Sequence, residues 1–246
     1  EENFTRSLVP PEPTPPPIDE SVPFNFGVEQ PRTDFRTYVP EPFGINRTTS
    51  NVGFDTRLNP KYKFENFVTG GSNRFAHAAA FAVSEQPAKA YNPLFIYGDS
   101  GLGKTHLLHA IGHEVLRENP NARILYMSAE RFMFDFVTAM RARDTFSFKA
   151  RLRSADVLMI DDVQFIAGKE STQEEFLHTV DELMTGGRRL VISADRAPHA
   201  LDGVEGRILS RLTQGLVADI GPADLGLRRS IVETKVNALG MPVPAE

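Results

Sequence analysis

The chain has 246 residues, of which 41% are hydrophobic and 24% are charged, and its formal net charge is −5. This is the composition of a globular protein with room for one large domain or two small ones, and the lack of cysteine excludes disulfides and thiolate chemistry. No apolar run is long enough to cross a membrane and no signal-peptide pattern is visible, so a cytoplasmic location is expected. Because the chain is acidic as a whole, any contact with nucleic acid requires a local basic patch.

The first part of the chain, residues 1–57, differs in composition from the rest. Most of the 18 prolines precede residue 46, including the run PPEPTPPP at 10–17. Since proline removes a backbone donor and interrupts helices, we expect residues 1–57 to form a disordered linker. The alternative is a tether that binds a partner through its scattered phenylalanines, which are Phe24, Phe26, Phe35, Phe43 and Phe54.

From Leu58 onward, short apolar runs alternate with stretches of helical periodicity. The helical stretches are 105–117 and 174–184, and one more helix is expected at about 228–239. Short, nearly continuous apolar runs are typical of parallel strands that are buried on both faces. The alternation predicts an α/β fold for residues 58–246, with a mostly parallel sheet of five strands. The expected strands are 94–97, 123–127, 156–160, 189–193 and 216–220.

The stretch GDSGLGKT at 98–105 matches the phosphate-loop pattern G-x-x-x-x-G-K-[ST], and it lies between an expected strand and an expected helix. Its glycines permit a tight turn whose N–H groups point at phosphate oxygens, and the following helix adds a partial positive charge. Lys104 is expected to reach the β- and γ-phosphates, and Thr105 to offer its hydroxyl to Mg²⁺. The predicted nucleotide-binding residues here are Gly98, Ser100, Gly101, Gly103, Lys104, Thr105 and His106.

The stretch DVLMIDD at 156–162 supplies the carboxylates that a phosphate loop needs. At the carboxyl end of a parallel strand, Asp161 would lie in the crevice where α/β folds bind ligands, and would hold Mg²⁺ directly or through water. Asp162 would orient or deprotonate the attacking water. The alternative for the pair is a solvated acidic turn. Histidines 109 and 113 share a helix face, but Ala110 follows the first of them where a zincin has Glu, so packing is the favoured interpretation.

Five segments together resemble the ATPase domain of the DnaA family of bacterial chromosomal replication initiators, within the AAA+ superfamily. They are 58–80, 91–114, 157–179, 191–198 and 203–212. The resemblance runs from about residue 58 to about residue 240. It implies a three-layer αβα AAA+ fold, ATP or ADP with Mg²⁺ as ligands, and a weak ATPase activity that serves mainly as a nucleotide switch.

The resemblance also assigns individual roles near the nucleotide. Phe67, Val68 and Asn73 would lie near the adenine, although the first two residues could equally be core. Asp195 resembles the first sensor of the family and would read the γ-phosphate. Because a bare carboxylate repels phosphate, that contact is expected to be indirect, through water or Mg²⁺.

Arg207 and Arg211 are four residues apart and share one helix face. By the resemblance, Arg211 would project to the γ-phosphate of a neighbouring subunit as an arginine finger, and Arg207 would support the same interface. The alternative, on spacing alone, is a solvated basic face.

Residues 129–154 are locally basic and carry interleaved phenylalanines. The resemblance implies two helices here, between the second and third strands, and a single-stranded DNA surface that includes Val137. A positive groove with apolar surfaces is what single-strand binding requires, and the charged candidates are Arg141, Arg143 and Lys149. The alternative is an ordinary amphipathic helix pair with solvated arginines.

The function implied by the resemblance is an initiator core that self-associates in its ATP form on the replication origin, helps to unwind it and is reset by hydrolysis. The family continues into a helical lid and a helix-turn-helix domain that reads duplex origin DNA, and both are expected to be largely or wholly absent here, which would weaken ATP affinity and hydrolysis. A replicative helicase and acidic phospholipids are further partners that the family implies. The alternatives are a DnaA-related regulator that lacks the duplex-binding domain and promotes hydrolysis by a partner initiator, and a metabolic P-loop kinase, for which no acceptor site is apparent.

Overall fold

The computed structural model describes residues 57–85 and 91–240. Apart from Arg57, the predicted proline-rich linker lies outside these residues and stays a prediction. Among the helices of the described ranges, none combines the length and hydrophobicity needed to span a membrane.

The described residues build one sheet of five parallel strands in the order β2-β3-β4-β1-β5. Every strand matches an expected apolar run to within one residue at each end. The near-continuous hydrophobicity of these runs follows from burial on both faces. The strands are β1 (Leu94–Tyr97), β2 (Ile124–Ser128), β3 (Val157–Asp161), β4 (Arg189–Ala194) and β5 (Leu216–Asp219).

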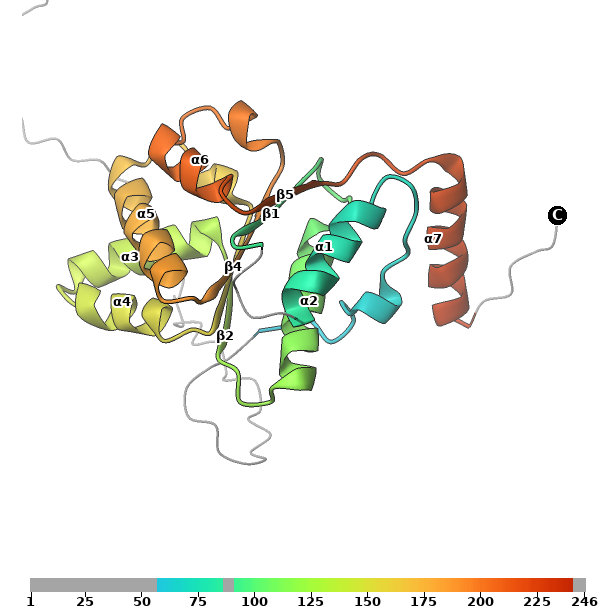
Figure 1. Cartoon of the computed structure of the whole chain (residues 1–246), viewed down its shortest axis with the longest axis horizontal. Helices are drawn as coiled ribbons and strands as arrows, with labels where there is room; N and C mark the ends of the chain where they lie inside the picture. The colour runs from blue at the N-terminus through green and yellow to red at the C-terminus, as the bar shows by residue number, and fades with distance from the viewer. Residues whose placement is uncertain (1–56, 86–90, 241–246) are drawn as a thin grey trace, which may run out of the picture. The chain divides into compact units, whose positions relative to one another are not determined.

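Helices cover both faces of the sheet, which gives the predicted three-layer arrangement (Figure 1). One face carries α1 (Arg74–Glu85) and α2 (Lys104–Glu118). The other face carries α3 (Ala129–Arg141), α4 (Thr145–Arg153), α5 (Glu170–Thr185) and α6 (Gly206–Leu212).

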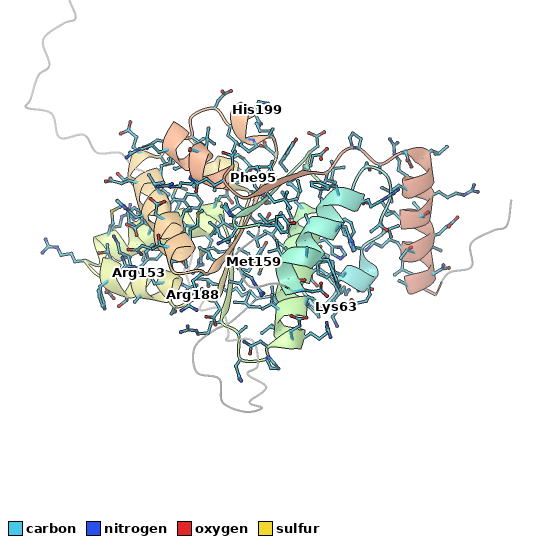
Figure 2. All side chains as sticks on the ribbon, viewed as in Figure 1. Lys63, Phe95, Arg153, Met159, Arg188 and His199 are labelled. Carbon is cyan, nitrogen blue, oxygen red and sulfur yellow. The ribbon has the colours of Figure 1, made fainter. Side chains whose placement is uncertain are left out.

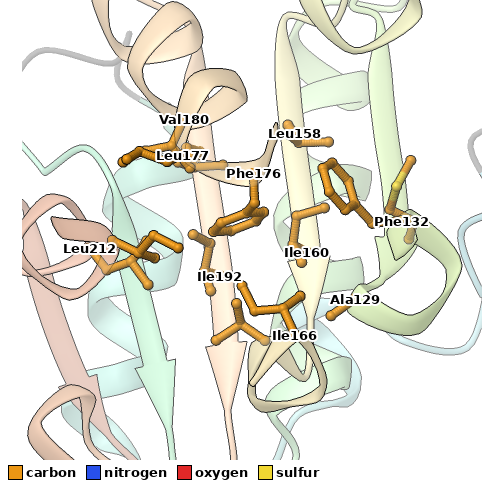
Figure 3. Close-up of a cluster of buried hydrophobic side chains, with 14 of the residues drawn as sticks. Ala129, Phe132, Leu158, Ile160, Ile166, Phe176, Leu177, Val180, Ile192 and Leu212 are labelled. Atoms are coloured by element: carbon orange, nitrogen blue, oxygen red, sulfur yellow. The ribbon is translucent and has the colours of Figure 1, made fainter. Parts of the chain in front are cut away.

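Alternate strand residues feed two separate hydrophobic cores. Phe95 packs with the α3–α6 layer, whereas Met159 packs with α1 and α2, and Figure 2 shows both in the interior. The core under α3–α6 is the larger, and Figure 3 shows Phe132 and Phe176 between the strands and the covering helices. Those two rings meet edge to face, with centroids 5.6 Å apart.

The two helices predicted between the second and third strands are confirmed as α3 and α4. Each begins at a capping side chain: Ser128 Oγ accepts from the N–H of Arg131, and Asp144 Oδ1 accepts from the N–H of Ser147. Arg143 adopts a left-handed conformation (φ +57°) in the corner between them.

The last helix, α7 (Leu225–Ala238), begins three residues earlier than expected because Asp224 caps it, accepting from the N–H of Leu227 at 2.7 Å. Leu227 is its buried side chain, and it packs against Gly70, where an added Cβ would come within 2.9 Å. The remaining described elements are the short 3-10 helices η1 (Phe64–Asn66), η2 (Val163–Ile166) and η3 (Pro198–Ala200).

Candidate nucleotide-binding site

The predicted phosphate loop joins β1 to α2 at the carboxyl edge of the sheet, and at two of its positions only glycine fits the backbone. Gly98 has φ +154°, and an added Cβ would lie 2.4 Å from the carbonyl oxygen of Ile220. Gly103 has φ +103°, and an added Cβ would lie 2.9 Å from the ring of Phe67. The loop is therefore closed tightly between β5 and the segment before α1, a geometry that only glycine permits.

Lys104 points into the concave side of this loop. Its Nζ donates to the carbonyl oxygens of Gly98 at 2.8 Å and Asp99 at 3.0 Å. Two of three ammonium donors are thus held by the loop itself, and one stays available for a ligand. The lysine lines a cleft of about 380 Å³, a size that suits a small-molecule ligand. The other lining residues are Tyr62, Ser100, Gly101, Gly103, Thr105, His106 and Asp162.

Asp161 ends β3 beside the phosphate loop, and only 4% of its surface is exposed. Its Oδ2 accepts from the hydroxyls of Thr105 at 2.7 Å and Tyr126 at 2.9 Å, and its Oδ1 accepts from Ser193. Burial together with the Asp161 charge raises the pKa of the Tyr126 hydroxyl, so that hydroxyl remains a donor.

The surroundings of Asp161 fit a divalent cation. Within the described ranges Asp161 has no ion-pair partner, so its buried negative charge is balanced by hydroxyl dipoles alone. A carboxylate and the Thr105 hydroxyl are hard oxygen donors of the kind that Mg²⁺ prefers. No cluster of three or more histidine, aspartate or glutamate side chains arranged to hold a metal occurs in the described residues, so the remaining ligands would come from nucleotide and water.

Asp162 and Asp195 lie at the ends of the neighbouring strands β3 and β4. Asp162 lines the cleft and adopts a left-handed conformation (φ +57°). Asp195 is held by Arg196 through two hydrogen bonds of 2.9 and 2.8 Å, which lower the pKa of its carboxyl group. Both carboxylates are thus presented at the same edge of the sheet as the phosphate loop.

The three residues predicted to lie near adenine surround one turn beside the loop. Phe67 packs edge to face on His106, with ring centroids 5.2 Å apart, and against Gly103. The Asn73 side chain is occupied within the turn: Oδ1 accepts from the N–H of Gly70 at 2.7 Å, and Nδ2 donates to the carbonyl of Val68 at 3.0 Å. Asn73 therefore shapes this turn, and Phe67 joins it to the loop.

The histidines of α2 fasten the segment before η1 to this helix. His109 Nδ1 accepts from the N–H of Asn59 at 3.0 Å, and His113 Nε2 donates to the carbonyl of the same asparagine at 2.8 Å. One turn earlier, His106 Nε2 donates to the carbonyl of Lys63 at 2.8 Å, and its ring stacks on Tyr62. Burial lowers the pKa of His109, which keeps it neutral and able to accept.

The two arginines of α6 project at the surface, and each has an acidic partner in its own chain. Arg211 pairs with Asp181 on α5 at 2.6 Å, with about two-fifths of each side chain exposed. Arg207 pairs with Glu205 at 3.0 Å. Gln173 on α5 fixes the start of α6. Its Oε1 accepts from the N–H of Glu205 at 2.7 Å, and its Nε2 donates to the carbonyl of Gly203 at 2.8 Å.

Ion pairs occupy most of the basic residues of α3 and α4. Lys149, a predicted DNA contact, pairs with the buried Glu175 at 2.8 Å, and about a third of the lysine side chain is exposed. Val137 is half-buried. Arg141 and Arg143, in contrast, have no ion-pair partner among the described residues, and Phe146 beside them is 78% exposed. Among the predicted DNA contacts, the unpaired charges thus lie at the corner between the helices. The paired residues are Arg131, Lys149, Arg151 and Arg153.

Several polar residues that organise the site escaped the sequence analysis. Tyr126 and Ser193 donate hydrogen bonds to Asp161, and Gln164 contacts Asp162 and Asp195. Gln173 fixes the start of α6. The usable signal was a polar residue within an otherwise apolar strand, as Ser193 is in RLVIS. A buried hydroxyl or amide needs a partner, so such positions point to an internal network.

A parallel sheet of this strand order, with a phosphate loop after β1 and an acid pair after β3, defines a P-loop ATPase domain of the AAA+ type. The sequence profile of the family described as the bacterial DnaA ATPase domain matches residues 58–219, and the chain belongs to this family.

Individual relatives agree with this assignment. The chain is 62% identical, over 73% of its length, to the chromosomal replication initiator protein DnaA of Zymomonas mobilis, and it spans 37% of that relative's length. Domain III of the Thermotoga maritima replication initiation protein DnaA superposes with a TM-score of 0.75 at 43% identity, covering 77% of this chain and 79% of the other. A replication initiator DnaA bound to AMPPCP and single-stranded DNA superposes with a TM-score of 0.72 at 37% identity, covering 76% and 58%.

Proposed function

We propose that this ATPase domain binds ATP with Mg²⁺, self-associates in the ATP form on single-stranded origin DNA, helps to open the origin and is reset to the ADP form by slow hydrolysis. The observation that carries the proposal is the convergence of Lys104, Thr105 and Asp162 on one cleft, with the buried Asp161 hydrogen-bonded to Thr105. The AMPPCP and single-stranded DNA named for the solved relative support the two ligands.

Each protein group around the phosphates has a separate role in this proposal. The free donor of Lys104 and the N–H groups of the loop bind the β- and γ-phosphates. Thr105 and Asp161 would hold Mg²⁺, which supplies neutralisation of the phosphate charge when it is bound. Asp162 orients the attacking water or takes its proton. Asp195, whose carboxylate is paired with Arg196, responds to the γ-phosphate indirectly.

We assign adenine to the turn formed by Phe67, Val68 and Asn73. The turn adjoins the phosphate loop through Phe67, and the Asn73 side chain fixes its backbone. A purine needs a flat apolar surface and backbone hydrogen-bonding groups, and this turn supplies both.

Self-association is assigned to α6, with Arg211 as the arginine finger and Arg207 as its support. The Arg211–Asp181 pair is solvent-accessible, so it contributes little stability and can be exchanged for a phosphate of the next subunit at low cost. Single-stranded DNA is assigned to Val137, Arg141 and Arg143, with Lys149 acting indirectly through its ion pair.

The rest of a protein as long as the Zymomonas relative would supply further contacts. We assign duplex origin DNA, the replicative helicase and acidic phospholipids to such regions.

Replacement of Arg211 tests the assembly role. Arg211→Ala should leave Mg-ATP affinity within about twofold but weaken ATP-dependent self-association roughly tenfold or more, because the arginine acts on the nucleotide of another subunit. Sedimentation velocity with ATP and with ADP measures this. Arg229→Ala is a matched control, since Arg229 pairs with Glu233 on the exposed side of α7. Identical assemblies of the Arg211 variant and the wild type in ATP would contradict the assignment.

A further inference from the structure

Gln164, two residues after Asp162, joins two proposed functional acids through a single side-chain amide. Its Nε2 donates to Oδ1 of Asp162 at 3.1 Å, and its Oε1 accepts from the backbone N–H of Asp195 at 3.2 Å. The orientation of the amide is fixed by chemistry. The reverse orientation would set its oxygen against a carboxylate and its NH₂ against an N–H group.

The backbone of Asp162 explains why such a contact matters. Asp162 has φ +57° and ψ +57°, a left-handed conformation that is uncommon for residues other than glycine. Such a conformation persists when its surroundings determine it, and it occurs often at functional sites. The N–H of Asp162 donates to Ser193 Oγ at 2.8 Å, and Ser193 also donates to Asp161, so the backbone is fixed from β4. The side chain is fixed by Gln164 alone among the described residues.

We propose that Gln164 is a positioning residue for ATP hydrolysis, which holds the Asp162 carboxylate toward the attacking water and ties it to the end of β4 that carries Asp195. This inference rests on the proposed hydrolysis. In that reaction the water oxygen bonds to the γ-phosphorus, the bond to the β,γ-bridging oxygen breaks, and the water proton passes to Asp162. Gln164 gains and loses no proton. The one hydrogen bond that its NH₂ group donates to Asp162 occupies Oδ1 and leaves Oδ2 for water.

The geometry also explains why an amide is needed here. A carboxylate at position 164 could still accept from the Asp195 N–H but would repel Asp162. An apolar side chain of equal length would lose both hydrogen bonds. The two substitutions therefore separate the contact with Asp162 from the contact with Asp195.

The test is single-turnover hydrolysis of Mg-ATP by the chain, with ATP affinity measured in parallel by calorimetry. Gln164→Met and Gln164→Glu should each slow hydrolysis about 10–100-fold, part of the effect expected of a general base, while the Kd for ATP changes less than about threefold. In an Asp162→Asn background, Gln164→Met should slow hydrolysis no further, because its effect passes through Asp162. Gln214→Met, a change of the same chemistry at an exposed position, is the control.

Four results would overturn the inference. They are an unchanged rate in Gln164→Met, a normal rate in Gln164→Glu, multiplicative effects of the two substitutions in the double variant, and a loss of ATP affinity as large as the loss of rate. A wild-type chain that binds ATP but never hydrolyses it would instead overturn the proposed hydrolysis, and the role of Gln164 with it.

Discussion

The carboxyl edge of the sheet and the α3–α4 corner carry the two proposed ligands, nucleotide and DNA, and they are built in opposite ways. At the sheet edge, Asp161 and Ser193 are buried and Asp161 is held by three hydroxyls. At the corner, Arg141 and Arg143 are exposed and unpaired within the described residues. A preorganised site favours one ligand geometry, whereas exposed surface charges attract a polyanion with little dependence on its sequence.

The largest expected effect is at the preorganised edge. Asp161→Asn should slow ATP hydrolysis about 100-fold and abolish the strengthening of ATP binding by Mg²⁺, because it removes the charge that would hold the ion. Hydrolysis assays and calorimetry with and without Mg²⁺ measure both effects. Asp156→Asn is the matched control, since Asp156 lies at the opposite end of β3 and pairs with Arg123 and Arg188. If the Asp161 variant keeps its full Mg²⁺ dependence, the carboxylate does not serve the ion.

A smaller effect is expected at the corner. Arg141→Ala and Arg143→Ala should each weaken single-stranded DNA binding about threefold to tenfold, and each should reduce the salt slope by about 0.7, because each arginine neutralises one phosphate. Fluorescence anisotropy at several salt concentrations measures this. Arg153→Ala should have less effect, because Arg153 is engaged with Glu182. Equal losses of DNA affinity in all three variants would contradict the assignment of single-stranded DNA to the corner.

The smallest effect concerns the histidines that fasten the segment before η1. His109 has a lowered pKa in the folded protein, so the unfolded chain binds more protons and stability falls as pH drops through about 6.5. Between pH 7 and pH 5.5 we expect the Tm of the wild type to fall by about 2–4 °C more than the Tm of His109→Gln falls. Scanning calorimetry at both pH values measures the difference. Parallel pH profiles would show that His109 does not contribute.

The same contrast explains what could be predicted from the sequence. The strands, the phosphate loop and the acid pair are local patterns: apolar runs placed the strands to within one residue, and short motifs located the loop and the acids. Hydrogen bonds between distant residues leave no local pattern: Ser193 reaches Asp161 across 32 positions, and Asn59 reaches His109 across 50. Charge also leaves no sign of its partner: the sequence does not show that Lys149 pairs with Glu175, 26 positions away.

If this cleft binds Mg-ATP through Lys104, calorimetric titration of Mg-ATP into the wild type and into Lys104→Ala will show it. Lys104 is buried and its ammonium occupies the inside of the phosphate loop. We expect one-to-one binding by the wild type and a loss of affinity of about 100-fold or more in the variant, because a charged donor to phosphate disappears. Equal affinities of the two proteins would contradict it.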